Sequence, residues 1–293
     1  MKVAILYFSG TGNTELCVKK WKKSAEALGI NVDLYKIESV NANDIDISQY
    51  DKVGFGYPIH AFNAPKNVWK YAKKVAKQNK KIPLFAIMCS GEYMNLNHSS
   101  FGKTKRILKR RGFVFESEYH YVMPYNMIFR HTEARALQMF ETMNKLVPID
   151  VKEYLVDNKP HKLKHCHLVG WLIFLFRIEQ PFAPINGKLY KVKKDKCIKC
   201  MKCVNNCPTH NIEFKDGKFK FHNHCLCCTR CSFNCPTDAF KIALLNSWRV
   251  NKPYAFKPLD IDEKDRHPRY CRRSYKRYFG EAAQRIENST NLD

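Results

Sequence analysis

The sequence has 293 residues, and its 51 lysines and arginines outnumber 27 acidic residues to give a formal net charge of +24. This length is sufficient for two domains with a large core. The most apolar stretch, Leu168 to Ile178, has about eleven residues, whereas a membrane-spanning helix needs roughly 20. We therefore expect no transmembrane span.

The 13 cysteines suit either a disulfide scaffold or metal–thiolate sites. The chain starts with an apolar run of about six residues that leads into a glycine turn, which is typical of a first β-strand and not of a signal peptide. Cytoplasmic proteins keep their thiols reduced. The sequence therefore predicts a cytoplasmic protein and favours metal–thiolate sites.

Strand and helix patterns alternate through residues 1–158. The predicted strands cover 2–8, 31–37, 52–57, 82–89 and 113–122, and the predicted helices cover 14–28, 65–79, 101–111 and 133–156. Pro148 is a possible break in the last helix. The continuous apolar run at 82–89 is typical of a strand buried in a parallel sheet. This pattern predicts an α/β domain with a parallel sheet.

The segment Ser9–Thr14, with the sequence SGTGNT, follows the first predicted strand and opens the first predicted helix. Its glycines permit a tight turn, and its hydroxyls and N–H groups converge where the helix N-terminus adds positive partial charge. This combination predicts a phosphate site. The segment lacks both the G-K-[ST] ending of a Walker A loop and the third glycine of the dinucleotide fingerprint. Without a lysine in the loop, nucleotide phosphoryl transfer is not expected.

The run YFSGTGNTE resembles the phosphate loop of flavodoxins, and the strand pattern extends this resemblance over residues 1–158. It implies a doubly wound sheet of order 2-1-3-4-5 that binds FMN at its switch point. The implied phosphate-binding residues are Ser9, Thr11, Gly12, Asn13 and Thr14. The residues implied to flank the flavin ring are Tyr57, Pro58, Ile59, His60, Ala61, Phe62, Ser90, Gly91, Glu92 and Tyr93.

Two cysteine runs share the spacing C-x2-C-x2-C-x3-C, and each is followed by a proline. The first run is Cys197, Cys200, Cys203 and Cys207, and the second run is Cys225, Cys228, Cys231 and Cys235. Three thiolates of one run can reach three corners of a [4Fe–4S] cube, and in this motif the fourth ligates the other cluster. We therefore expect one cluster on Cys197, Cys200, Cys203 and Cys235, and one on Cys225, Cys228, Cys231 and Cys207. Zinc sites and a disulfide scaffold are the less favoured alternatives.

Residues 190–245 resemble bacterial two-cluster ferredoxins, which implies a small α+β domain with two [4Fe–4S] clusters. The whole chain resembles the flavodoxin–ferredoxin fusion proteins of anaerobic bacteria, and the segment 243–254 supports this. Residues 159–189 are expected to form a connector with an apolar packing helix, and 246–293 a basic, aromatic extension. The additional thiol of Cys227 is expected to pack away from the cluster.

A flavin exchanges one or two electrons and a [4Fe–4S] cluster exchanges one, so joining them converts between single and paired electrons. The first hypothesis is an electron carrier that links the clusters, FMN and a redox partner. The alternative is an FMN-dependent reductase of a small organic substrate, with His60, Tyr93 or Glu92 as the proton donor. A redox-sensing or nucleic-acid-associated protein is a third possibility. The positive charge should steer an acidic redox partner, and no nucleic-acid-binding motif accompanies it, so no nucleic acid is expected.

Overall fold

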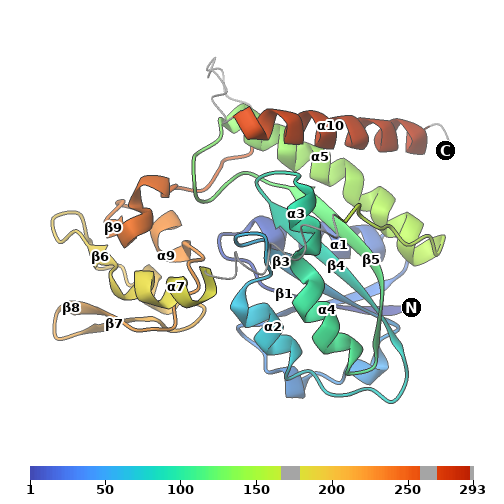
Figure 1. Ribbon diagram of the computed structural model, residues 1–293, viewed down its shortest axis with the longest axis horizontal. Coiled ribbons are helices and arrows are strands. Elements are labelled where there is room, and N and C mark those ends of the chain that lie inside the picture. The colour runs from blue at the N-terminus through green and yellow to red at the C-terminus, as the bar shows by residue number, and fades with distance from the viewer. Residues whose placement is uncertain (166–178, 258–268, 291–293) are drawn as a thin grey trace.

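A computed structural model of the protein describes residues 1–165, 179–257 and 269–290. The apolar helix expected at 168–178 lies outside the described residues. The N-terminal half forms a sheet covered by helices, and a smaller domain with short strands lies beside it (Figure 1). Among the described helices, none is both long enough and apolar enough to cross a membrane.

The large domain is built on five parallel strands in the order β2-β1-β3-β4-β5. The strands are β1 (Lys2–Tyr7), β2 (Asn31–Lys36), β3 (Lys52–Pro58), β4 (Ile82–Ser90) and β5 (Phe113–Val122). The central strands are buried on both faces, because helices cover each side of the sheet. The predicted doubly wound α/β fold is confirmed, and each strand ends within about one residue of its predicted end.

Two hydrophobic cores lie on opposite faces of this sheet. One contains residues of α1, α5 and α10, and the other contains residues of α2 and α4. The helices of this domain are α1 (Asn13–Glu26), α2 (Lys66–Ala72), α3 (Asn95–His98), α4 (Gly102–Lys109) and α5 (Glu133–Val151), with 3-10 turns at Ala42–Asp44, Ile47–Gln49 and Ser99–Phe101.

Two predicted helices differ from the structure. The helix expected at 65–79 ends at Ala72, because the following segment turns to pair with α4, where the Gln78 N–H donates to the Arg111 carbonyl at 2.9 Å. The helix expected at 133–156 is not broken at Pro148. It continues to Val151 and then widens into a π-turn over Lys152–Val156, beyond the residue that lacks an N–H donor.

The small domain consists of two antiparallel strand pairs and short helices. Helix α7 (Glu179–Lys188) leads into it. Its elements are β6 (Lys191–Val192), α8 (Lys202–Asn205), β7 (Ile212–Lys215), β8 (Lys218–Phe221), α9 (Arg230–Phe233), β9 (Phe240–Lys241) and a 3-10 helix at Ala243–Trp248. Strand β6 pairs with β9, and β7 forms a hairpin with β8.

The C-terminal extension returns to the large domain. Helix α10 (Arg269–Thr290) runs along α5 (Figure 1). The hydroxyl of Tyr275 donates to the Gly91 carbonyl at 2.9 Å, and that of Tyr254 donates to the Tyr125 carbonyl at 2.7 Å. The extension therefore supports the loops that follow β4 and β5.

Candidate functional site

The loop between β1 and α1 has the geometry of a phosphate site. Gly12 adopts a left-handed conformation with φ of 113°, and the space where a Cβ would stand is open. The Ser9 hydroxyl accepts hydrogen bonds from the N–H groups of Gly12 and Glu15, both at 3.2 Å, and so holds the loop in shape. Within the described chain, the buried Thr14 hydroxyl has no hydrogen-bond partner. A phosphate bound at the start of α1 would satisfy it.

A cavity of about 290 Å³ extends from this loop along the carboxyl ends of the strands. Ser9, Thr11, Asn13 and Thr14 line it, as predicted from the sequence. The other predicted residues that line it are Pro58, Ile59, His60, Ala61, Phe62, Ser90, Gly91 and Glu92. The cavity lies where a doubly wound fold binds its ligand, and its polar end is the phosphate loop.

Two residues that the sequence predicts to flank the flavin ring, Tyr57 and Tyr93, do not line the cavity. Tyr57 points into the core, where its ring stacks on Phe101 at 5.6 Å between centroids. The backbone N–H of Tyr93 donates to the Ser274 hydroxyl at 2.5 Å, and its ring packs on Tyr278. Helix α10 therefore holds Tyr93 in place, and no sequence motif indicates that contact.

A third wall of the cavity, residues 123–128, was not predicted. Tyr125 lies against Gly91, which has no room for a Cβ beside the tyrosine ring. The Asn126 side chain donates to the Thr11 hydroxyl, and the Asn13 side chain donates to the Pro124 carbonyl at 2.8 Å. This loop follows β5. Only its position at the carboxyl end of a strand could have indicated from sequence that it lines the cavity.

Glu92 is a buried acid in the cavity wall. The Asn97 amide donates to its carboxyl oxygen at 3.1 Å, and the Tyr125 hydroxyl donates to the other oxygen. Burial raises the pKa of Glu92, and the hydrogen bond from Asn97 opposes this only in part. Across the cavity, burial lowers the pKa of His60 to about 4, so its imidazole is neutral at pH 7.

The two cysteine runs fold alike. Met201 and Thr229 each adopt a left-handed conformation with φ of 54° and 53°, and each precedes a four-residue helix. The Cys207 sulfur accepts a hydrogen bond from the Asn211 N–H at 3.2 Å, and Cys235 accepts one from the Ala239 N–H at 3.3 Å. The equivalent positions differ by 28 residues throughout, so the small domain is a structural repeat.

Each run lines a cavity together with the fourth cysteine of the other run. Cys197, Cys200, Cys203 and Cys235 line one, where Cys231 also reaches the wall, and Cys207, Cys225, Cys228 and Cys231 line the second. Among the described residues, no three histidine, cysteine or acidic side chains are grouped to hold a single metal ion, as zinc with bonds of about 2.3 Å would need. The two sets of four cysteines around these cavities are the sets that the motif predicts for [4Fe–4S] clusters.

The second run touches the phosphate loop. A Cβ on Gly10 would lie 2.9 Å from the Cys228 carbonyl oxygen, so only glycine permits this approach. Cys227, Cys228 and Thr229 form part of the wall of the large cavity. His60 hydrogen-bonds the backbone of Leu226. The small domain thus closes one side of the candidate flavin site.

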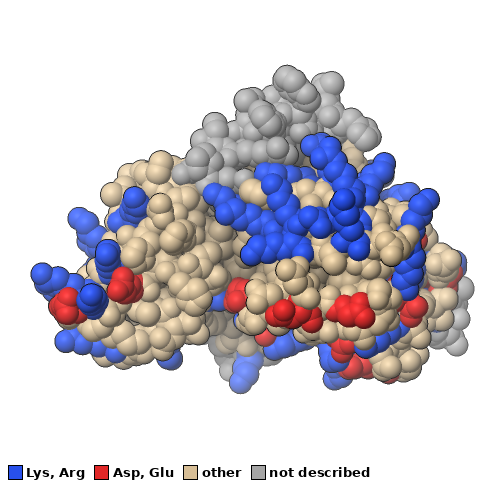
Figure 2. All heavy atoms as spheres, turned by 90° about the horizontal axis from the view of Figure 1, so that it is seen from below, with Lys and Arg blue, Asp and Glu red and all other residues tan. Residues whose placement is uncertain are grey.

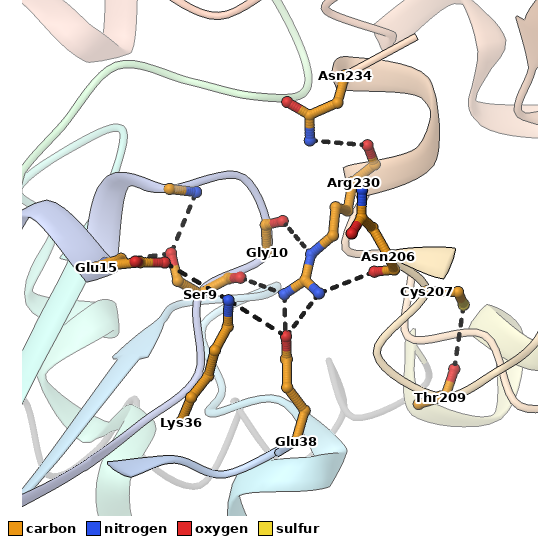
Figure 3. A network of polar contacts seen from close by, with 11 residues as sticks. Ser9, Gly10, Glu15, Lys36, Glu38, Asn206, Cys207, Thr209, Arg230 and Asn234 are labelled. Carbon is orange, nitrogen blue, oxygen red and sulfur yellow. Dashed lines mark hydrogen bonds and ion pairs between the residues drawn. The ribbon is translucent and has the colours of Figure 1, made fainter. Parts of the chain in front are cut away.

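Arg230 fixes this contact (Figure 3). Its guanidinium donates to the carbonyls of Ser9 at 2.6 Å and Gly10 at 2.8 Å. The same group forms an ion pair with Glu38 at 2.6 Å, and the two side chains are only 11% and 9% exposed. It also donates to the Asn206 carbonyl in the first run at 2.9 Å. One side chain therefore joins both runs to the phosphate loop.

The first run faces solvent instead. Cys200 is exposed, and the neighbouring Ile198 side chain is 63% exposed. Lys194, Lys196 and Lys199 surround it and are exposed as well. Cys227, the additional thiol of the second run, is buried and packs near Tyr190 and Asn186.

Comparison with known proteins defines both halves. Residues 4–115 match the model of the flavodoxin domain, and residues 190–213 match that of the 4Fe-4S binding domain. The chain therefore joins a flavodoxin domain to a 4Fe–4S domain. A flavodoxin domain implies FMN, and the second domain implies at least one [4Fe–4S] cluster.

An uncharacterized protein of Methanocaldococcus jannaschii is 33% identical over 88 residues, which are 29% of this chain and 53% of that protein. The chain thus matches about half the length of this curated relative. The Streptococcus pneumonia TIGR4 flavodoxin is 17% identical, with 51% of this chain and 99% of that chain covered and a TM-score of 0.34. The NAD(P)H:quinone oxidoreductase of Methanothermobacter marburgensis is 10% identical, with 56% and 99% covered and a TM-score of 0.37.

Proposed function

We propose that the protein carries electrons between an external redox partner, two [4Fe–4S] clusters and FMN. The first cluster is held by Cys197, Cys200, Cys203 and Cys235, and the second by Cys207, Cys225, Cys228 and Cys231. FMN has its phosphate at Thr11, Gly12, Asn13 and Thr14, with Ser9 shaping the loop. When bound, the flavin supplies the step between one-electron and two-electron chemistry.

One observation carries this proposal: Cys228 lies in the wall of the cavity that begins at the phosphate loop. The contact between Cys228 and Gly10 is so close that any side chain at position 10 would clash with the Cys228 carbonyl. Arg230 and Glu38 hold the two domains in this arrangement. The second cluster is thereby adjacent to the flavin. The first cluster lies beyond the second cluster, farther from the flavin.

The external partner docks at the first run. An exposed apolar residue, Ile198, is followed by the exposed Cys200, and lysines that are close in sequence (Lys194, Lys196 and Lys199) are exposed too. An apolar centre with a polar rim is typical of protein interfaces, and the lysines select an acidic redox protein in the cytoplasm. Its association should slow as salt rises. Association rates that do not change with salt would contradict this docking site.

Cofactor analysis tests the proposal. The anaerobically purified protein should contain about eight iron and eight sulfide per chain, as two cubes require, and heat should release one FMN. Bound zinc in place of iron would exclude the clusters, and FAD or no flavin would exclude the phosphate-loop assignment. Replacing Thr14 with alanine should weaken FMN binding, while replacing the exposed Thr290 at the end of α10 should not.

The buried acid in the cavity wall supports a second candidate, an FMN-dependent reductase of a small organic substrate. Glu92 is protonated more readily than an exposed glutamate, because burial raises its pKa. It could supply the proton that accompanies transfer of an electron pair to a substrate. The reduced protein would then be reoxidised by small quinones or enones in a single step that Glu92→Gln slows. Reoxidation at the same rate in this variant would remove the candidate.

A further inference from the structure

A strongly basic face covers one side of the large domain. It consists of α2, the segment 73–81 and α4 with the two arginines that follow (Figure 2). We call it the lysine face, and its thirteen basic residues are Lys66, Lys70, Lys73, Lys74, Lys77, Lys80, Lys81, Lys103, Lys105, Arg106, Lys109, Arg110 and Arg111. The only acidic residue between positions 66 and 111 is Glu92, which is buried. The net charge of this stretch is therefore +12, from thirteen positive and one negative side chain.

The structure gathers these charges on two neighbouring helices. Helices α2 and α4 pack side by side. The Arg111 guanidinium donates to the Val75 carbonyl at 2.6 Å, which joins the ends of the two helices. In the described ranges, no ion pair includes a lysine from 70 to 81. One or two cations at a helix C-terminus are favourable, but like charges at this density repel one another.

The lysine face runs from the cavity end of the sheet, where Lys66 shares a small pocket with His60 and Cys225, to the opposite ends of the strands, where Lys80 and Lys81 lie. Lys80 and Lys81 immediately precede β4, and Ser90 at the end of β4 lines the cavity. Nine steps of 3.3 Å along this strand separate Lys81 from Ser90 by about 30 Å. A partner bound at this end of the face would therefore be far from the flavin. The face is suited to attachment and not to electron exchange.

The composition of the face distinguishes between kinds of partner. In the described part of the chain, none of the strongly exposed large apolar side chains belongs to α2, residues 73–81 or α4. Protein interfaces have an apolar core in which lysine is depleted. The Trp69 ring is covered by the Lys103 ammonium at 3.4 Å and so offers no stacking surface for bases. Ten of the thirteen basic residues are lysines. A lysine acts as a point charge, whereas an arginine can form two parallel hydrogen bonds to one carboxylate or phosphate.

We propose that the lysine face docks the protein on an anionic phospholipid surface. An anionic bilayer presents many negative headgroups, which attract cations without requiring a specific hydrogen-bond geometry. Each lysine near its surface contributes about 1 kcal/mol to the binding free energy. The attachment is peripheral and electrostatic. It leaves the cavity and the first cysteine run directed toward partners in solution or beside the membrane.

Vesicle binding tests this with the full-length holoprotein. The protein should sediment with vesicles of phosphatidylcholine containing phosphatidylglycerol at low salt, and not with phosphatidylcholine alone. Changing Lys73, Lys74, Lys77, Lys80 and Lys81 to glutamine should weaken binding more than about 100-fold, because each lysine contributes a factor of about five. Iron and flavin content verifies that the variant is folded.

The matched control changes five exposed lysines of the small domain, Lys191, Lys194, Lys215, Lys218 and Lys220, to glutamine. It removes the same total charge and should bind the anionic vesicles like the unmodified protein. Equal losses in both variants would mean that net charge alone acts, which overturns the proposal. Absence of binding to anionic vesicles, with binding to acidic polypeptide instead, would assign the face to a protein partner and also overturn it.

Discussion

The two cysteine runs have nearly the same backbone but very different surroundings. In the first run Cys200 is exposed within a group of lysines, whereas in the second Cys228 lies against the phosphate loop. The repeat supplies two similar cluster sites, and the contacts outside the repeat separate their roles. We infer that the first run receives or releases electrons at the surface and that the second passes them to the flavin.

A single pair of equivalent residues illustrates this difference. Arg230 of the second run corresponds to Lys202 of the first, 28 positions earlier. Arg230 is held by Glu38 and by two carbonyls of the phosphate loop. Lys202 begins α8 next to Met201 and forms no such contact within the described residues. Variants compared in pairs test this difference.

The largest effect is expected from removing one ligand of each run. Cys200→Ser and Cys228→Ser should each lose about half of the roughly eight iron atoms, because each removes a ligand of one cube. Only Cys228→Ser should also weaken FMN binding, because that loop forms part of the cavity wall. Metal analysis and flavin titration measure both effects. Equal FMN affinity in the two variants would contradict the different roles of the runs.

Arg230→Ala should destabilise the fold by about 1–3 kcal/mol, because it leaves Glu38 with only the weaker ion pair to Lys36 at 3.6 Å and removes the donor to two carbonyls of the phosphate loop. Lys202→Ala is the matched control and should change the free energy of unfolding by less than about 0.5 kcal/mol. Chemical denaturation followed by flavin fluorescence measures the difference. Similar losses in the two variants would show that Arg230 does not join the domains.

Gly10→Ala should lower the free energy of unfolding by about 1–3 kcal/mol, because its Cβ would meet the Cys228 carbonyl at 2.9 Å. The same change at Gly280, where nothing lies within 4 Å in helix α10, should stabilise by about 0.5–1 kcal/mol. Thermal unfolding compares the two. If Gly10→Ala did not lower the free energy of unfolding, the second run would not be in close contact with the phosphate loop.

The smallest effect is a pH dependence confined to the large domain. Burial lowers the pKa of His98 to about 4, below the value of about 6.5 in an unfolded chain. The unfolded chain therefore binds more protons between these values, and the free energy of unfolding falls as the pH drops through this window, by up to about 1.4 kcal/mol per pH unit. His98→Gln should reduce this slope by one proton. If the pH dependence of the free energy of unfolding were unchanged in this variant, the lowered pKa of His98 in the folded protein would be wrong.

The local features were predictable from sequence because they depend on near neighbours. The five strands, the phosphate loop and the cysteine spacing were all recognised from patterns shorter than about fifteen residues. The left-handed Gly12 and the repeat of the cysteine runs follow from the same kind of signal. The fold and about half of the residues that line the cavity were predicted on this basis.

The contacts between distant segments were not predictable. Arg230 and Glu38 are 192 positions apart, and no motif connects them. The positions of Tyr93 and Tyr125 depend on α10 and on the loop after β5, which carry no recognisable pattern. Helix α2 ends early because Gln78 pairs with Arg111. In each case tertiary packing determined an outcome that local propensity could not.

The central claim is that the second cluster lies next to the flavin, and electron paramagnetic resonance tests it most directly. The protein would be poised so that the flavin holds one electron while the clusters are reduced. We expect a flavin signal that is broadened and relaxes fast through coupling to the neighbouring cluster, in the unmodified protein and in Cys200→Ser but not in Cys228→Ser. A narrow, slowly relaxing flavin signal in the unmodified protein would contradict the account.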